Sequence, residues 1–378
     1  MGSRSHYAER KPAVSSLPHR GLTHLGMDVH KDSISIGILA PEDDSPEVEK
    51  IFHDEASVRR FMARFDDPRR LVACYEAGPT GYELCRLLMS MGVACQVIAP
   101  SLIPRTAADR VKTDRRDCRK LARLHRSGNL VAIRVPNRQE EAIRDLCRAR
   151  ADMVEDLDRA RKRLGAFLLR HSVVWRGGNA WTVKHHEWLA GRRFDDPALA
   201  ATFAHYRAVV DARERELAAA GADLAPWYDR DPFADTVRRL CAYRGVAQLG
   251  ALTLASEVCD WRRFGRASAF MGFTGLVPSE YSSGGKTSRG HITKAGNWHI
   301  RTQLIESAWA YQSGPSVGVE LRKRQEGVDA DTLKRAWAAQ TRLCGRFRRL
   351  AARKNSKNVV AAAVARELCG FLWAEMTA

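Results

Sequence analysis

The sequence predicts a mixed α/β N-terminal part that long helices join to a mainly α-helical C-terminal part. Apolar residues alternate with polar ones over much of the first third of the chain, which indicates half-buried strands. From Asn137 onward, apolar residues recur three and four positions apart, as in a helix that packs on another helix. A chain of 378 residues is long enough for two or three domains.

The N-terminal elements follow a recognisable order. Residues 1–21 are polar and without a period, so we expect a flexible tail. Three strands come next, in LTHLGMDV, DSISIGIL and EVEKIFH. A helix near residues 57–65, the strand RLVACYE, the helix GYELCRLLMSM, the strand VACQVIA and a helix from Thr113 to Gly128 complete the domain. This order over residues 22–136 favours a ribonuclease H type sheet over a doubly wound dinucleotide-binding domain, and no GxGxxG follows the first strand.

Residues 137–234 are expected to form a coiled-coil helical region. A long helix begins near Asn137, and a second helical stretch runs from about Pro197 to Ala222. WRGGNAW forms a turn between them, and the second helix either folds back on the first or pairs with another subunit. The apolar stripe of the first helix, interrupted only by Arg150, consists of Ile143, Leu146, Met153, Leu157, Ala160, Leu164 and Phe167.

The C-terminal region, residues 235–378, begins with LCAYRGVAQLGALTLASEV. We expect a helix to break at Arg244-Gly245 and to resume after Gly250, as in a helix-hairpin-helix whose amides hold a nucleic-acid phosphate. An ordinary helical turn is an equal alternative. A glycine-rich basic loop, YSSGGKTSRGHITKAGN, follows, and then a helix from about Asn297 and a basic helical segment.

Charge is the strongest signal in the composition. The chain has 62 Lys and Arg against 44 Asp and Glu, a net charge of +18 and a pI near 9.9, which favours nucleic acid as the partner. No apolar run approaches the roughly 20 residues of a membrane helix, so we expect a cytoplasmic protein. Nine scattered cysteines without a CxxC pair argue against a disulfide framework and a zinc site.

Four carboxylates stand at the ends of predicted elements. Asp28 ends the first strand and Glu76 ends LVACYE, while Asp114 and Asp117 share one stripe of their helix with its apolar residues. The basic residues of this helix lie on the opposite side, so we expect the acids to face inward. Such carboxylates repel one another and predict a hard divalent cation, with Mg²⁺ the common choice. Pairing with nearby arginines is the structural alternative.

The glycine-rich loop has two interpretations. In the simpler one, its glycines permit turns while Lys286, Arg289 and Lys294 bind phosphates. In the other, Ser282 or Ser283 is a nucleophile that attacks phosphorus, with the cations stabilising the charge that develops. The loop alone does not decide between them.

Four segments together resemble the DEDD-type insertion-sequence transposases, which are bridge-RNA-guided serine recombinases. The segments are GMDVHKDS, YEAGPTGYEL, RTAADRVKTDRRDCRKLARL and the stretch from LASEVCDW to KAGNWHIR. The resemblance implies a RuvC-like domain, a coiled coil and a C-terminal transposase domain. It implies that Asp28, Glu76, Asp114 and Asp117 bind Mg²⁺, or Mn²⁺ in its place. It also aligns the family's serine with Ser283, although the neighbouring Ser282 leaves an ambiguity of one residue.

The resemblance further implies partners: donor and target DNA, a structured non-coding guide RNA, and further copies in a homodimer or homotetramer near the bacterial nucleoid. It leaves one rival enzyme, a RuvC-like structure-specific nuclease in which metal-activated water attacks DNA and the serine loop only grips it. A non-catalytic scaffold for RNA and DNA is the rival from another class.

Overall fold

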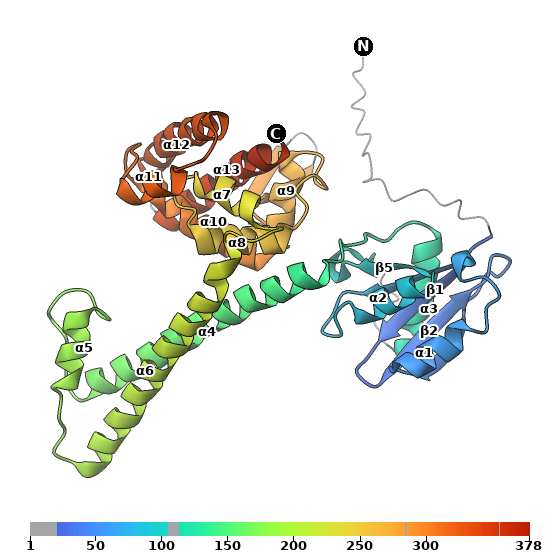
Figure 1. The fold of residues 1–378 in the computed structure, drawn as a ribbon, viewed down its shortest axis with the longest axis horizontal. Helices are drawn as coiled ribbons and strands as arrows, with labels where there is room; N and C mark the ends of the chain where they lie inside the picture. Colours follow the sequence, from blue (N-terminus) through green and yellow to red (C-terminus); the bar gives the residue numbers. More distant parts are fainter. Residues whose placement is uncertain (1–20, 105–112, 284–285, 355) are drawn as a thin grey trace. The chain divides into compact units, whose positions relative to one another are not determined.

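The computed structural model describes residues 21–104, 113–283, 286–354 and 356–378. These residues divide into two compact units, the first ending at Pro136 and the second beginning at Asn137 (Figure 1). Apart from Gly21, the expected N-terminal tail lies outside the described residues.

The first unit contains a five-stranded mixed sheet in the order β3-β2-β1-β4-β5. The first three strands in the chain pair antiparallel, whereas β4 pairs parallel to β1 and β5 pairs parallel to β4. This confirms the predicted mixed α/β domain and is consistent with a ribonuclease H type arrangement. The strands are β1 (Thr23–Val29), β2 (Ser33–Leu39), β3 (Glu47–Phe52), β4 (Leu71–Glu76) and β5 (Ala94–Ile98).

Helices cover both faces of this sheet. On one face, α1 (Glu55–Met62) and α2 (Glu83–Ser90) pack on the apolar side chains of the strands, among them Met27 and Tyr75. On the other face, α3 (Asp114–Arg126) lies unusually close to the strands. A Cβ added to Gly26 would lie 2.3 Å from the backbone nitrogen of Ala122, so only glycine permits this approach.

The second unit begins with α4 (Arg138–Arg170), α5 (Val183–Ala190) and α6 (Pro197–Leu224). A capping box between Asn137 and Glu140 starts α4 where the sequence predicts a helix to begin. α6 packs on the later half of α4 (Figure 1), so within one chain the second helix folds back on the first. Whether the pair also forms a coiled coil with another subunit stays a prediction.

The apolar stripe of α4 serves two separate cores. Leu157, Leu164 and Phe167 pack with residues of α5 and α6. Ile143 instead belongs to the core of the C-terminal helices. The beginning of the helix therefore contacts a different neighbour from its end, and the predicted coiled coil stays a prediction.

Most of the remaining helices of the second unit contribute to one large apolar core, which confirms a mainly helical C-terminal part. They are α7 (Ala234–Cys241), α8 (Gln248–Val258), α9 (Ala267–Thr274), α10 (Trp298–Ala308), α11 (Val319–Gln325), α12 (Ala330–Ala351) and α13 (Lys357–Thr377).

The glycine-rich basic segment was expected to be a loop, and here the structure differs. Its backbone forms a two-stranded antiparallel hairpin of β6 (Pro278–Ser283) and β7 (Lys286–Ile292), named the serine hairpin below. Glycine, serine and lysine are poor strand formers, so residue propensity hides the hairpin.

All nine cysteines are free, as the sequence predicts. Among the described residues, no helix combines the length and the apolar character that crossing a bilayer requires.

Candidate active site

The register of the sheet brings two of the predicted acids to neighbouring strand ends. β1 and β4 run parallel, with Met27 paired to Tyr75. One residue further along, Asp28 and Glu76 stand at the carboxyl ends of these adjacent strands. Neighbouring strands are separated by about 4.8 Å, so the two backbones are close at this edge.

Both acids project toward the face of the sheet that α3 covers. Gly26 contacts α3, and Asp28 is two residues further along β1, so it lies on the same face. Cys74 also contacts α3, because its Sγ lies 3.8 Å from the carbonyl oxygen of Leu121, and Glu76 follows it by two residues. The first turn of α3 carries Asp114 and Asp117. All four acids therefore belong to one edge of one face.

The tightest group at this edge consists of Asp28, Asp114 and His30. Their potential ligand atoms all lie within 4.8 Å of one another, whereas Glu76 and Asp117 lie outside this group. His30 Nε2 is 3.1 Å from Asp28 Oδ2 and 3.6 Å from Asp114 Oδ1. Sequence reasoning missed His30, although GMDVHKDS places it two residues after Asp28.

The electrostatics of the group indicate unneutralised negative charge. The pKa of Asp28 is raised from its usual value, chiefly by burial, while His30 opposes the rise and the charges of Asp114 and Asp117 add to it. Lys50 Nζ is 4.0 Å from Asp114 Oδ2, the limit of an ion pair. Carboxylate oxygens at this spacing fit a hard divalent cation.

The expected inward orientation of the acids on α3 is wrong for Asp114, whose side chain is 49% exposed. The buried side of the helix consists of Cys118, Leu121, Ala122 and His125. Asp114 is the first residue of α3, beyond the area where the helix covers the sheet, so it reaches the edge and not the core.

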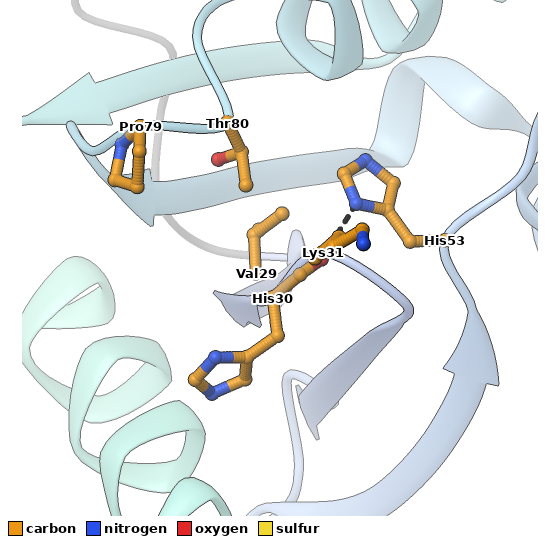
Figure 2. A pocket seen from close by; sticks show the side chains of 6 residues that line it. All are labelled: Val29, His30, Lys31, His53, Pro79 and Thr80. Atoms are coloured by element: carbon orange, nitrogen blue, oxygen red, sulfur yellow. Dashed lines mark hydrogen bonds between the residues drawn. The ribbon is translucent and has the colours of Figure 1, made fainter.

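An open pocket of about 480 Å³ adjoins these acids. Figure 2 shows its lining side chains, with His53 bonded through Nδ1 to the carbonyl oxygen of His30 at 2.7 Å. The lining comes from the end of β1 and the turn after it, from the loop after β4, and from His53, which directly follows β3. The residues are Val29, His30, Lys31, His53, Pro79 and Thr80.

A second group of metal-ligating side chains lies in the helical hairpin of the second unit. His186, Asp211 and Glu214 hold their ligand atoms within 4.8 Å of one another. Arg161 Nη2 is 2.6 Å from Glu214 Oε1, and Arg207 Nε is 3.8 Å from Asp211 Oδ2. Arginine charges already balance these carboxylates, so we interpret the group as structural.

The backbone of the serine hairpin places both candidate nucleophiles at the end of β6. Ser282 pairs with Thr287, and Ser283 pairs with Lys286 next to the turn. The side chains of Ser282, Ser283, Lys286 and Arg289 lie outside what the structure describes. The choice between the two serines is therefore not tested.

Lys294 follows the hairpin with a backbone φ of +54°, and its amide donates to the carbonyl oxygen of Gly275 at 3.1 Å. Its side chain is exposed. Phosphate binding by Lys286, Arg289 and Lys294 stays a prediction.

The two glycines of the expected helix-hairpin-helix pack against α10. Gly245 has a φ of +84°, and an added Cβ would lie 2.2 Å from the carbonyl oxygen of Ser307. At Gly250 an added Cβ would lie 2.4 Å from Nε2 of Gln303. Helix α8 begins at Gln248 and so already includes Gly250, contrary to the expected restart after it. Close packing accounts for both glycines, and their binding of phosphate stays a prediction.

Comparison with known proteins identifies the class of enzyme. Residues 25–172 match a family model described as "Transposase", whose name specifies the DEDD type. Residues 237–317 match a second model, described as "Transposase IS116/IS110/IS902 family". The first match contains all four predicted acids, and the second contains the serine hairpin.

Bacterial relatives match most of the chain. "Putative transposase y4qE" of Sinorhizobium fredii is 44% identical over 318 residues, which cover 84% of this chain and 77% of that protein. "Transposase for insertion sequence element IS1533" of Leptospira borgpetersenii is 34% identical over 335 residues, covering 86% of this chain and 96% of that protein. "Transposase for insertion sequence element IS1328" of Yersinia enterocolitica is 23% identical over 303 residues.

A family of the DEDD type depends on divalent metal ions, which agrees with the acidic edge of the first unit. From these matches along both units, the chain belongs to the IS110/IS116 family of insertion-sequence transposases, enzymes that bind, cut and rejoin DNA.

Proposed function

We propose that this transposase joins DNA through a covalent intermediate on Ser283, assisted by a metal site of Asp28, Glu76, Asp114 and Asp117. The observation that carries the proposal is the convergence of these acids on one edge of the sheet, with Asp28 and Asp114 already within ligand distance of each other. A Mg²⁺ ion, or Mn²⁺ in its place, supplies positive charge that neutralises the scissile phosphate when it is bound there.

In the serine step, one phosphoester bond replaces another. The Ser283 hydroxyl oxygen attacks phosphorus, a deoxyribose oxygen leaves, and the hydroxyl proton passes to a base while the leaving oxygen gains a proton. The phosphoserine retains the phosphoester, so a second deoxyribose hydroxyl can displace the serine and rejoin DNA without a nucleotide cofactor. Lys286, Arg289 and Lys294 hold the backbone, because cations beside the attacked phosphate stabilise its charge.

The partners in this proposal are donor and target DNA, a structured guide RNA and further copies of the chain in a dimer or tetramer. A net charge of +18 supports polyanionic partners. The first unit, from residue 22 to 136, then acts as the DEDD domain, the helices up to residue 234 as a coiled-coil region, and the remainder as the transposase domain. The proposed location is the bacterial cytoplasm, at the nucleoid.

The experiment is a denaturing gel of labelled DNA incubated with protein, guide RNA and Mg²⁺. Wild type is expected to give a covalent protein–DNA band that Ser283→Ala removes and that Ser282→Ala largely keeps. The two variants are matched controls, because each removes one hydroxyl from the same strand. A band that survives in Ser283→Ala moves the nucleophile to Ser282. Hydrolysed ends without any band in wild type identify a metal-dependent nuclease instead.

A further inference from the structure

A buried carboxylate on the last full turn of α8 bonds to the segment that follows the serine hairpin. The side chain of Glu257 is 1% exposed. Arg148 on α4 binds it with two hydrogen bonds, Nε to Oε1 at 2.7 Å and Nη2 to Oε2 at 2.9 Å. A carboxylate buried this deeply is strongly destabilising unless its charge is paired and its oxygens are bonded, so this group is tightly constrained.

A third bond connects Glu257 to the exit of the hairpin. Asn297, five residues after β7 ends, donates from Nδ2 to Glu257 Oε2 at 2.7 Å. The other end of the same amide, Oδ1, accepts from the backbone nitrogen of Ile300 at 3.0 Å and caps α10. The backbone nitrogen of Asn297 donates to the carbonyl oxygen of Phe273 at 2.9 Å. One residue is therefore held at three points.

The two chain segments at the base of the hairpin are also fixed to each other. The backbone nitrogen of Thr293 donates to the carbonyl oxygen of Val277 at 2.8 Å. Gly296 has a φ of +114°, and a Cβ there would lie 2.2 Å from the carbonyl oxygen of Phe273. At Gly275, a Cβ would lie 2.4 Å from the carbonyl oxygen of Ala295. Neither approach tolerates a side chain, so the base of the hairpin has little freedom.

We propose that Glu257 is a positioning residue for the reaction: through Asn297 it sets the direction in which the serine hairpin leaves the helical domain, and hence the position of Ser283. Glu257 does not touch the reacting atoms in this proposal. Its role is to join α4, α8 and the start of α10 into one support. The inference rests on the proposed function, in which Ser283 attacks DNA.

The pKa of Glu257 supports this role. Burial raises it, but the bonds from Arg148 and Asn297 outweigh burial, so the pKa is lowered from its usual value. The group is charged at neutral pH and remains a strong acceptor for the Asn297 amide.

Asn297→Asp separates positioning from helix capping. Aspartate caps a helix as well as asparagine does, but it turns the donor 2.7 Å from Glu257 into a second carboxylate oxygen. Asn297→Ser also keeps a capping oxygen and loses the bond to Glu257 without adding charge. We expect adduct formation to fall by about 100-fold in Asn297→Asp and by at least about 10-fold in Asn297→Ser, because small misplacements of reacting groups have effects of this order.

The double variant Glu257→Gln/Asn297→Asp exchanges donor and acceptor while it preserves the net charge of the pair. We expect it to recover about threefold of the activity lost in Asn297→Asp, since the glutamine amide can donate to the new carboxylate while Arg148 loses its bond to the atom that replaces Oε2. DNA binding, measured by filter retention, is expected to be unchanged in all three variants. Asn137→Ser is the matched control, because it makes the same change at the N-cap of α4, away from the hairpin.

Two failures are distinguishable. If wild type forms the adduct and Asn297→Ser forms it at the wild-type rate, Glu257 does not position the hairpin. If Asn297→Ser loses the adduct but also unfolds, as seen by circular dichroism, the double variant decides: no recovery with a restored fold overturns the inference. If wild type itself gives only hydrolysed ends, the proposed serine chemistry fails, and the inference that rests on it fails with it.

Discussion

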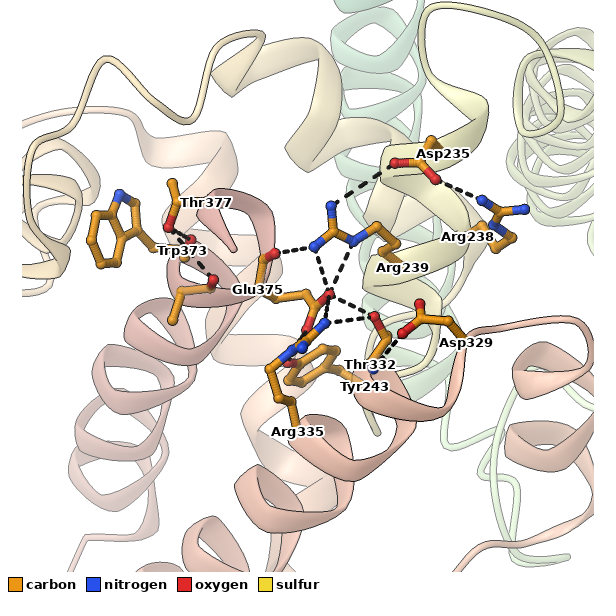
Figure 3. A network of polar contacts seen from close by, with 11 residues as sticks. Asp235, Arg238, Arg239, Tyr243, Asp329, Thr332, Arg335, Trp373, Glu375 and Thr377 are labelled. Carbon is orange, nitrogen blue, oxygen red and sulfur yellow. Dashed lines mark hydrogen bonds and ion pairs between the residues drawn. The ribbon is translucent and has the colours of Figure 1, made fainter.

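The protein contains two clusters of charged side chains in which a carboxylate has opposite electrostatic environments. At the edge of the sheet in the first unit, Asp28 and Asp114 stand within ligand distance of each other, beside His30 and, at 4.0 Å from Asp114, Lys50. In the second unit, Glu375 on α13 is fully buried and surrounded by donors (Figure 3). The pKa of Asp28 is raised, and the pKa of Glu375 is lowered to about 2.

The Glu375 cluster satisfies its carboxylate completely. Arg335 donates from Nε to Oε2 at 2.6 Å, Arg239 donates from Nε to Oε1 at 2.9 Å, and the Thr332 and Tyr243 hydroxyls donate at 2.7 and 3.0 Å. Burial alone raises the pKa of this carboxyl, but the hydrogen bonds outweigh burial. The cluster needs no further cation, so it ties α7, α12 and α13 together as a structural element.

The contrast separates the structural use of a charge from the functional one. A carboxylate that serves stability is surrounded by protein cations, whereas one that must accept an external cation keeps its charge only partly compensated. The four predictions below test this distinction.

The largest expected effect is on catalysis. Asp114→Asn removes one negative charge from the acidic edge and so weakens binding of the metal ion there. If the metal ion lowers the activation barrier by several kcal/mol, its loss decreases the rate of DNA cleavage by about 10³-fold or more. Quantified cleavage of labelled DNA in Mg²⁺ measures this effect. Glu367→Gln is the control, because Glu367 pairs with Arg342 and Arg346 of the second unit and belongs to neither cluster. Cleavage by Asp114→Asn at the wild-type rate would remove this residue from the site.

The second effect is on stability. Glu375→Gln leaves Arg239 and Arg335 without their anion, and breaking a buried pair in this way lowers the free energy of unfolding by about 3–5 kcal/mol. Urea denaturation of the second unit's helices, followed by circular dichroism, measures the change. The exposed pair variant Glu320→Gln is expected to change it by less than about 1 kcal/mol.

The same residue gives the stability a defined pH dependence. Because the pKa of Glu375 is about 2 in the folded protein and near 4.5 ordinarily, its contribution is complete above pH 4.5 and disappears as the pH falls toward 2. This difference is worth about 3 kcal/mol. Wild type should therefore lose more stability than Glu375→Gln over that interval, and parallel curves would show that Glu375 is not held as a stabilised anion.

Much of the first unit could be predicted from the sequence, because its strands alternate apolar and polar residues and its helices carry caps. The positions of Asp28 and Glu76 near the ends of β1 and β4 were also predictable, because the apolar patterns of both strands stop there. The exposure of Asp114 was not predictable, because helical periodicity gives the direction of a side chain and not the point at which the helix passes the edge of the sheet.

Other features depend on contacts distant in sequence. Glu257 bonds to Arg148, which is 109 positions away in the sequence, and no local pattern indicates such a pairing. The division of the α4 stripe between two cores has the same origin, because a heptad pattern does not identify its neighbour. His30 carried a usable signal, its position two residues after Asp28, which a search for carboxylates alone overlooked.

The smallest expected effect distinguishes the two clusters most directly. The raised pKa of Asp28 means that ionising this carboxyl is unfavourable in the folded state without metal. Below the usual pKa near 3.8, Asp28 is protonated in the folded and the unfolded chain, so its titration does not change the free energy of unfolding. As the pH rises from there through the higher folded pKa, the protein loses stability. Asp28→Asn in EDTA at pH 7 should therefore keep or raise the melting temperature.

Asp54→Asn is the matched control, for which the expected change has the opposite sign. Hydrogen bonds from Ser57 lower the pKa of Asp54, the exposed N-cap of α1, so the melting temperature of this variant should hold or fall slightly. Adding Mn²⁺ should raise the melting temperature of wild type and of Asp54→Asn but not of Asp28→Asn, because only a protein that binds the ion is stabilised by it. If Asp28→Asn melts well below wild type in EDTA, Asp28 is a satisfied structural anion like Glu375, and the acidic edge is not prepared for a cation.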